Sequence, residues 1–129
     1  MAKLYESGEN YLETILILSA NGEAVRSIDI VRMMEVSKPS VSRAVGILRD
    51  GGFILIDAEG FITLTETGRE VAERIYERHR VLTDWLMDLG VSEEVAAEDA
   101  CKLEHDISEV SFAALKEHLR KAHPSVPTP

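Results

Sequence analysis

The sequence predicts a mainly α-helical protein with one small β-hairpin, and three observations carry this prediction. Apolar residues recur at the three-to-four-residue spacing of helices along most of the chain. Between residues 53 and 64 the period changes, and two short β-branched or aromatic runs flank a four-residue turn. Serine and threonine caps, together with Asn-Gly and Gly-Gly pairs, mark the ends of the helical segments. The expected order is three helices, a hairpin and three more helices.

Each of the three expected N-terminal helices has its own start or stop signal. The first carries an apolar stripe and ends at Asn21-Gly22. The second begins at Ser27, which can cap it, and the third follows Ser37, a good N-cap, and ends at Gly51-Gly52. Pro39 is tolerated in the first turn of the third helix. The expected bounds are about Glu6 to Ala20 for the first helix and Ser27 to Met34 for the second, and the third lies between its N-cap Ser37 and the terminating Gly51-Gly52.

The hairpin and the C-terminal half follow from the same kinds of signal. Asp57-Ala58-Glu59-Gly60 forms the loop between the two expected strands. Thr67 and Glu70 have the spacing of a capping box at the start of a long helix. The expected segments are strands at 53–56 and 61–64, and helices from 65–67 to Gly90, from 92 to 106 and from 108 to 122.

This order of elements is that of a winged helix-turn-helix, in which the third helix enters the DNA major groove and the hairpin lies along the phosphate backbone. Lys38 and Arg43 should lie on the face of the third helix turned away from the core. The short serine hydroxyls beside them can bond phosphates or base edges. The alternative is an ordinary solvated helix face. The candidate DNA-contacting residues are Ser37, Lys38, Pro39, Ser40, Ser42 and Arg43.

The composition is that of an ordinary globular protein, with 45% hydrophobic and 29% charged residues among 129. No apolar stretch approaches the roughly 18 residues of a membrane span, and the N-terminus has no signal-peptide pattern. We therefore expect a cytoplasmic protein that does not bind membranes. The single cysteine, Cys101, cannot form an internal disulfide, so its thiol is available as a metal ligand or as a core residue.

The formal net charge of −9 is opposite to the usual charge of a nucleic-acid-binding protein. Charges farther away than about 10 Å are largely screened, so the local field at the contact helix decides. No acidic residue lies between Val36 and Arg49, a stretch that contains Lys38 and Arg43. Acidic residues crowd instead between Asp84 and Glu109, where a cation would be favoured.

A second group of residues has the chemistry of a metal site. On a helix, residues at i, i+3 and i+4 share a face, so Cys101, Glu104 and His105 should present a thiol, a carboxylate and an imidazole together. These groups are ligands of mixed softness for first-row transition metals. The alternative is a buried cysteine, a solvated carboxylate and a structural histidine.

Further candidate ligands lie on other helices. Glu9, Asn10 and Glu13 share one face of the first helix, and His79 is a lone imidazole on the long helix. Taken singly, such residues more often have structural or solvated roles. The residue pattern alone does not predict that these helices meet.

Six segments of the chain match a known family: Tyr11-Leu12-Glu13-Thr14-Ile15, Val36-Ser37, Ser40-Val41, Leu64-Thr65-Glu66-Thr67-Gly68, Arg78-His79-Arg80, and Asp99 to Ser108. On these segments the chain resembles the diphtheria toxin repressor family of iron- and manganese-dependent regulators. The resemblance covers nearly the whole chain except the Pro-rich tail. It implies a homodimer built on the C-terminal helices, with divalent metal bound where these helices meet the first one. We expect a winged-helix DNA-binding domain at residues 1–65, a helical metal-binding and dimerisation domain at 66–123, and a flexible tail at 124–129.

The resemblance also implies a ligand set. Asn10 stands where the family usually has Asp or Met, so it offers a weaker carboxamide oxygen. Thr83 and Ala97 stand where the iron-responsive branch has a Glu and a His. The chain stops before the SH3-like domain of that branch, and with Glu13 this resembles the short manganese-responsive members, whereas Cys101 is the choice of the iron branch. The implied metal ligands are Glu13, His79, Cys101, Glu104, His105 and Asn10.

The expected function is that of a DNA-binding transcriptional repressor that controls metal-homeostasis genes from a palindromic operator, with Mn²⁺ or Fe²⁺ as corepressor. Zn²⁺, Co²⁺ or Ni²⁺ could occupy the site in vitro. One alternative is a winged-helix regulator that responds to an organic ligand or a protein partner without sensing metal. Another is a metallohydrolase with Glu104 as base. The sequence lacks a Gly-rich loop or nucleophile motif that would shape a substrate cleft, so we do not expect an enzyme.

Overall fold

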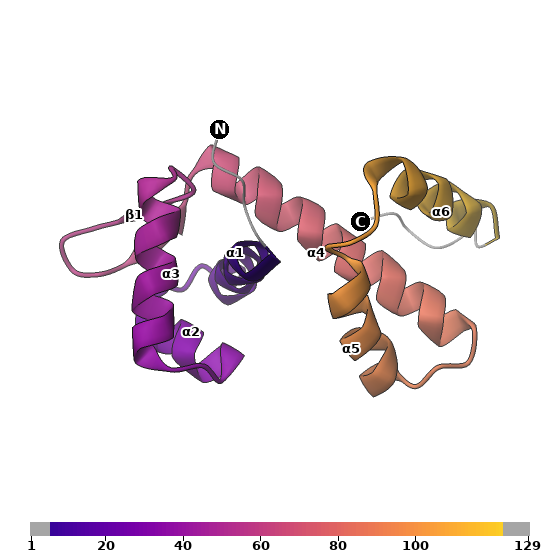
Figure 1. Cartoon of the computed structure of the whole chain (residues 1–129), viewed down its shortest axis with the longest axis horizontal. Coiled ribbons are helices and arrows are strands. Elements are labelled where there is room, and N and C mark those ends of the chain that lie inside the picture. The colour runs from indigo at the N-terminus through magenta and orange to yellow at the C-terminus, as the bar shows by residue number, and fades with distance from the viewer. Residues whose placement is uncertain (1–5, 123–129) are drawn as a thin grey trace. The chain divides into compact units, whose positions relative to one another are not determined.

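The computed structural model describes residues 6–122, and the predicted tail at 124–129 lies outside the described residues. The described part holds six helices and one two-stranded antiparallel sheet (Figure 1), which confirms the predicted fold class. Contacts divide the chain into two units, Met1–Arg74 and Ile75–Pro129. The elements are α1 (Glu6–Ser19), α2 (Ser27–Met34), α3 (Lys38–Asp50), β1 (Ile54–Ile56), β2 (Ile62–Leu64), α4 (Glu66–Asp88), α5 (Glu93–Leu103) and α6 (Glu109–Ala122).

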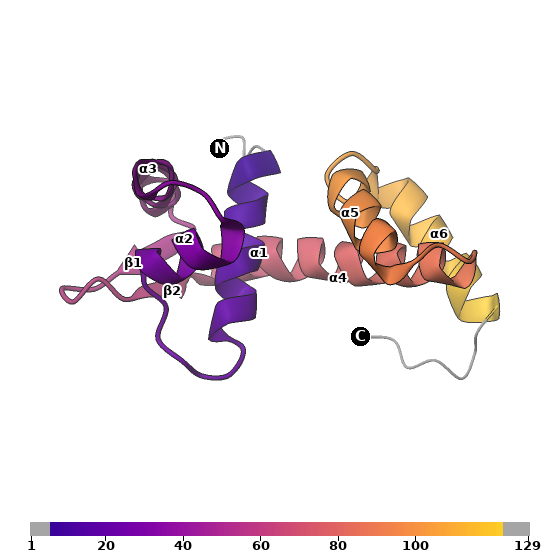
Figure 2. The ribbon, with the colours of Figure 1, turned by 90° about the horizontal axis from the view of Figure 1, so that it is seen from below.

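The first unit is built around one apolar core shared by α1, α2, α3 and the hairpin. Figure 2 shows α1 lying beside α2 and the hairpin, and β2 contacts α1 while β1 contacts α3. The Ile62 N–H also donates to the Val25 carbonyl (2.8 Å), which ties the segment before α2 to the sheet. These contacts hold α3 by its inner face. The most deeply buried core residues are Leu12, Ile15, Val25, Ile30, Val41, Leu48, Ile54, Ile62 and, from α4, Ala72.

The caps of α2 and α3 differ in how well the sequence predicts them. Ser37 caps α3 as expected, because its hydroxyl oxygen accepts the N–H of Ser40 (3.2 Å). The prediction that Ser27 caps α2 is wrong by one residue, since the N-cap is Arg26 and Ser27 is already helical. The Asp29 carboxylate accepts the Arg26 N–H (2.9 Å), so the helix can begin one residue earlier.

α4 starts within the predicted window of 65–67, but its capping residue differs from the prediction. Thr65 caps this helix, because its hydroxyl oxygen accepts the N–H of Gly68 (3.1 Å) while donating to the Gly52 carbonyl (2.7 Å). The predicted capping box of Thr67 and Glu70 is therefore wrong. The bond to Gly52, thirteen residues away in sequence, favours Thr65 as the cap and is invisible to a local pattern.

The second unit consists of the C-terminal part of α4 with α5 and α6. Its buried apolar residues come from all three helices, among them Ile75 and Leu82 of α4, Ala100 of α5 and Phe112 of α6. α5 ends at Leu103, three residues before the expected end at residue 106, and a turn follows in which the N–H groups of residues 106 and 107 both bond the Leu103 carbonyl. Glu104 and His105 therefore stand at the end of α5 rather than inside it.

No helix among the described residues combines the length and apolar character that crossing a membrane would need.

Candidate metal centre and DNA-contacting helix

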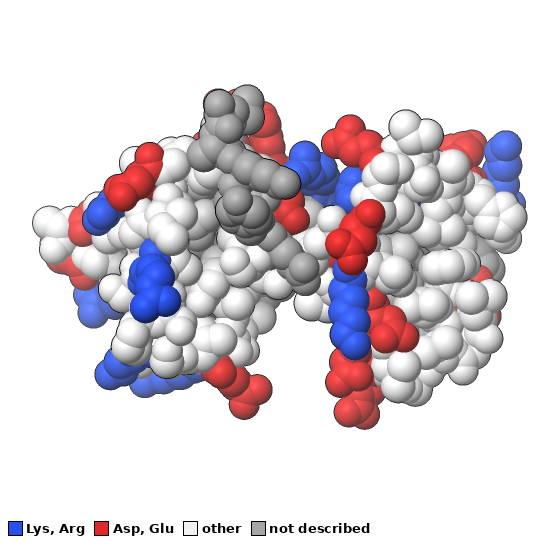
Figure 3. Space-filling view, viewed as in Figure 1, with Lys and Arg blue, Asp and Glu red and all other residues white. Residues whose placement is uncertain are grey.

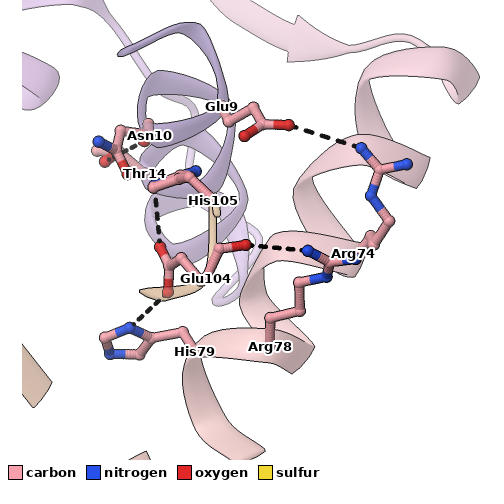
Figure 4. A network of polar contacts seen from close by, with 8 residues as sticks. All are labelled: Glu9, Asn10, Thr14, Arg74, Arg78, His79, Glu104 and His105. Atoms are coloured by element: carbon pink, nitrogen blue, oxygen red, sulfur yellow. Dashed lines mark hydrogen bonds and ion pairs between the residues drawn. The ribbon is translucent and has the colours of Figure 1, made fainter. Parts of the chain in front are cut away.

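The carboxylate of Glu104 lies between two histidines in the second unit. It is completely buried, and its Oε2 is 2.9 Å from Nδ1 of His79 on α4 (Figure 4). Its Oε1 is 3.4 Å from Nε2 of His105, an ion-pair distance without hydrogen-bond geometry. The His105 side chain is 2% exposed and that of His79 is 29% exposed. Glu104 and His79 thus bring together a carboxylate and an imidazole, two ligand types that first-row divalent metals take.

The neighbouring Arg78 holds the backbone of the same turn. Its Nη1 donates to the carbonyl oxygens of Glu104 (3.1 Å) and Ile107 (2.6 Å). The guanidinium also stacks over the ring of Phe112 on α6, with Cζ 5.3 Å from the ring centroid. Two consecutive residues of α4 thus contact Glu104: Arg78 bonds the backbone carbonyl of Glu104, and His79 bonds its carboxylate.

Cys101 differs from Glu104 in its surroundings. The thiol-bearing residue is exposed, whereas Glu104, three residues later, is fully buried. α5 ends at Leu103, and Glu104 is its C-cap, in helical conformation and with its N–H bonded to the Ala100 carbonyl. Ligation by Cys101 stays a prediction.

The candidate ligands of α1 belong to the first unit. Glu13 is 8% exposed, and a buried carboxylate needs a compensating partner, of which a cation is one kind. Glu9 forms an ion pair with Arg74 (Oε2 to Nη2, 3.6 Å), also within this unit. The backbone carbonyl of Asn10 accepts a hydrogen bond from the Thr14 hydroxyl (2.9 Å). Ligation by Glu13 and Asn10 stays a prediction.

The outer face of α3 has the exposure that DNA contact requires. All six predicted contact residues, from Ser37 to Arg43, are exposed, while the inner face of the helix is buried. In Figure 3, Lys and Arg side chains lie over α3. The same view shows Asp and Glu side chains gathered over α5. The negative net charge is therefore not spread evenly, and the surface of α3 suits a phosphate backbone.

The sequence analysis missed one residue of this face. Ile47 is 64% exposed although it is a large aliphatic residue in the middle of α3. It lies four residues after Arg43 and eight after Pro39, so the three share a helix face. This spacing was available in the sequence, but an isoleucine in an apolar stripe predicts burial rather than exposure.

The tip of the hairpin is acidic. The Asp57 carboxylate accepts the N–H groups of Glu59 and Phe61, both at 2.9 Å, and this closes the loop. The guanidinium of Arg26 stacks on the Phe61 ring at 4.3 Å. Basic side chains near this strand therefore come from the segment before α2 rather than from the loop itself.

Comparison with known proteins identifies both parts of the chain. Residues 3–58 match the family described as iron dependent repressor, N-terminal DNA binding domain. Residues 65–125 match the family described as iron dependent repressor, metal binding and dimerisation domain. The two matches together cover most of the chain, in the order in which the two domains follow one another.

Individual relatives agree with these matches. A helix-turn-helix transcriptional regulator of Methanocaldococcus jannaschii is 31% identical over 118 residues, which cover 90% of this chain and 94% of that protein. The transcriptional regulator MntR of Salmonella typhimurium is 32% identical over 106 residues, covering 82% of this chain and 68% of MntR.

Among solved structures, the manganese regulator SloR aligns with a TM-score of 0.80 at 32% identity. The alignment covers 88% of this chain but 53% of SloR, so the chain spans about half the length of that protein. Since both domain families match in order and a relative is aligned over nearly its full length, the chain belongs to the family of iron-dependent repressors.

Proposed function

We propose that this protein is a cytoplasmic repressor that binds a palindromic operator as a homodimer when Mn²⁺ or Fe²⁺ is bound, and so controls metal-homeostasis genes. The observation that carries the metal part of the proposal is the buried Glu104 carboxylate between His79 and His105. A carboxylate with no exposed surface, flanked by two imidazoles, suits a cation better than water or an apolar ligand.

The proposed ligands come from both units. His79, Glu104 and His105 form the part contributed by the second unit, and Cys101 lies one helical turn before Glu104. Glu13 and Asn10 are the proposed ligands from α1.

Metal binding would affect DNA binding by way of α1. This helix packs against both α2 and α3, so fixing α1 also fixes the recognition helix of each protomer. The exposed Lys38 and Arg43 would then contact the operator, with the serine hydroxyls of α3 beside them. Two such helices at a set spacing match a palindromic site. Metal would therefore favour the DNA-competent state, provided that it binds that state more tightly.

The test is fluorescence-anisotropy binding of the purified protein to candidate promoter DNA at one fixed salt concentration. Binding is measured in chelator and then with Mn²⁺, anaerobic Fe²⁺ or Zn²⁺. We expect tight operator binding only when metal is present. Metal should raise the affinity for the operator about 5- to 150-fold, as is typical of linked sites. Glu104→Gln should abolish the metal response, because it keeps the shape of the side chain but removes its charge.

The matched control is Glu94→Gln, the same change at an exposed position of α5 in the same unit. This variant should respond to metal like the wild type. Equal operator binding in chelator and in metal would contradict metal sensing and would favour a regulator that responds to another ligand. A full metal response in Glu104→Gln would show that the cation binds elsewhere.

A further inference from the structure

Arg78 is an arginine buried in the second unit with its charge directed at the backbone. It is 6% exposed, and its two hydrogen bonds go to carbonyl oxygens at the start and the end of the turn 104–107. The bond to Ile107 is short, at 2.6 Å. One guanidinium nitrogen thus spans the turn that connects α5 to α6.

Burying Arg78 costs free energy that an apolar residue used only for packing would not cost. Burying a cation requires compensation, and an apolar side chain of similar volume often packs at lower cost. The Nε–H of Arg78 donates to no partner among the described residues, so the guanidinium is not fully satisfied. The interactions that Arg78 does make are with the two carbonyls and the Phe112 ring of α6. Its placement is explained by the turn that it holds.

The turn 104–107 carries the side chains of two candidate metal ligands, Glu104 and His105. The backbone of Glu104 is bonded to Arg78, and the carboxylate of Glu104 is bonded to His79, the next residue of α4. His105 follows in the same turn, with its side chain 2% exposed and its Nε2 3.4 Å from Oε1 of Glu104. Fixing the carbonyls of residues 104 and 107 therefore fixes the direction in which both side chains leave the backbone.

We propose that Arg78 is the positioning residue of the metal centre. It holds the turn 104–107 so that Glu104 and His105 face His79 before a cation arrives. This inference rests on the proposed function, because it assigns a role toward the metal that the centre would bind. Residues that orient metal ligands through hydrogen bonds typically change metal affinity by about 10- to 100-fold when they are replaced.

The test compares Arg78→Met and Arg78→Lys with the wild type. Methionine keeps an apolar stem of similar length but removes both hydrogen bonds. Lysine keeps the charge, but its Nζ lies short of the position of the arginine Nη1, so it restores the contacts in part. The matched control is Arg120→Met, the same change at an exposed arginine of α6 that pairs with Glu117.

Three measurements report positioning, and a fourth reports the stability of the fold. Calorimetric titration with Mn²⁺ gives metal affinity, and the visible absorption spectrum of the Co²⁺-loaded protein reports ligand geometry. Hydrogen exchange of a peptide covering residues 104–107 reports the turn in the metal-free protein. Melting followed by the fluorescence of Trp85, the single tryptophan, gives the stability of the fold.

We expect Mn²⁺ affinity to fall about 10- to 100-fold in Arg78→Met and several-fold in Arg78→Lys, with an altered Co²⁺ spectrum and faster exchange at 104–107. Arg120→Met should match the wild type in all three. A lowered melting temperature with Mn²⁺ affinity within twofold of wild type would overturn the inference. If Arg78→Met does not fold, Arg78→Lys decides by the same criterion.

Different results would contradict the positioning role of Arg78 and the proposed function. If the wild type binds Mn²⁺ and Glu104→Gln does not, while Arg78→Met and Arg78→Lys bind normally, the positioning role alone is wrong. If the wild type binds neither Mn²⁺ nor Co²⁺, the metal centre itself is wrong and the role of Arg78 is overturned with it.

Discussion

The carboxylate of Glu104 is completely buried, although acidic side chains are rarely found fully inside proteins unless they are paired. Its partners are histidines, which carry a charge only when protonated and are common metal ligands. Cys101, on the preceding turn, is exposed. At the scale of single residues, burial therefore distinguishes the carboxylate at the centre of the site from a cysteine at its edge.

Ile47 is the residue of α3 whose exposure calls for a partner. An exposed aliphatic side chain on the face that carries Arg43 suits the C5-methyl group of thymine, which projects into the major groove. We predict that Ile47→Ala weakens operator binding about fourfold for each methyl contact that is lost. Burial of one carbon group is worth about 0.8 kcal/mol, which corresponds to that change in affinity. Folding stability should change little, because the side chain is mostly in solvent.

The measurement is a double-mutant cycle in which operator thymines are replaced one at a time by uracil, which lacks the methyl group. At the contacted position, uracil should weaken binding by the wild type and have no further effect on Ile47→Ala. Independent, additive losses at every thymine would mean that Ile47 contacts no methyl group.

At the scale of elements, the junction between the hairpin and α4 is the tightest backbone contact among the described glycines. A Cβ added to Gly68 would lie 1.9 Å from the carbonyl oxygen of Phe53, so the backbone would have to move. The Thr65 N–H donates to this same carbonyl (3.1 Å). The first turn of α4 is therefore docked on the residue that precedes β1.

We predict that Gly68→Ala destabilises the fold by about 1–3 kcal/mol, the usual cost of forcing extra atoms into a packed site. Gly46→Ala is the opposite case, because Gly46 lies inside α3 with nothing within 4 Å of the added carbon. That change should stabilise by about 0.5–1 kcal/mol through helix propensity. Urea unfolding of both variants checks the pair, and equal midpoints would contradict the close contact at Gly68.

At the scale of the whole molecule, charge is divided between two functions. The net charge is −9, yet no acidic residue lies between Val36 and Arg49, while acidic residues crowd between Asp84 and Glu109. The recognition helix thus keeps a basic surface, and the acidic part of the chain is the one that carries Glu104. An acidic protein can bind DNA in this way, because screening confines each field to its own surface.

Metal should also stabilise the folded protein as a whole. A ligand that binds the folded state alone stabilises it by about 2.7 kcal/mol at 100 times its dissociation constant. We predict this gain for Mn²⁺ added to the metal-free protein, measured by urea unfolding with Trp85 fluorescence. Excess chelator should reverse the gain, and Glu104→Gln should not show it. A gain of equal size in Glu104→Gln would place the stabilising cation away from the candidate centre.

Local patterns in the sequence were sufficient for the order of the elements and for the polar residues on the exposed face of α3, but not for Ile47. Helical periodicity and the change of period at residues 53–64 depend on residues close in the chain, so the prediction agrees with the structure there. Ser37 was identified as a cap for the same reason, since its partner is three residues away. The segments around His79 and Cys101 also carried the family resemblance.

Tertiary contacts decided the rest. Thr65 caps α4 because it also bonds Gly52, and Arg78 holds the turn after α5 across 26 and 29 residues of sequence. The grouping of His79 with Glu104, 25 residues apart, depends on the packing of α4 against that turn. No local period encodes these pairs, because each forms only when segments distant in the chain are brought together by burial of the apolar core.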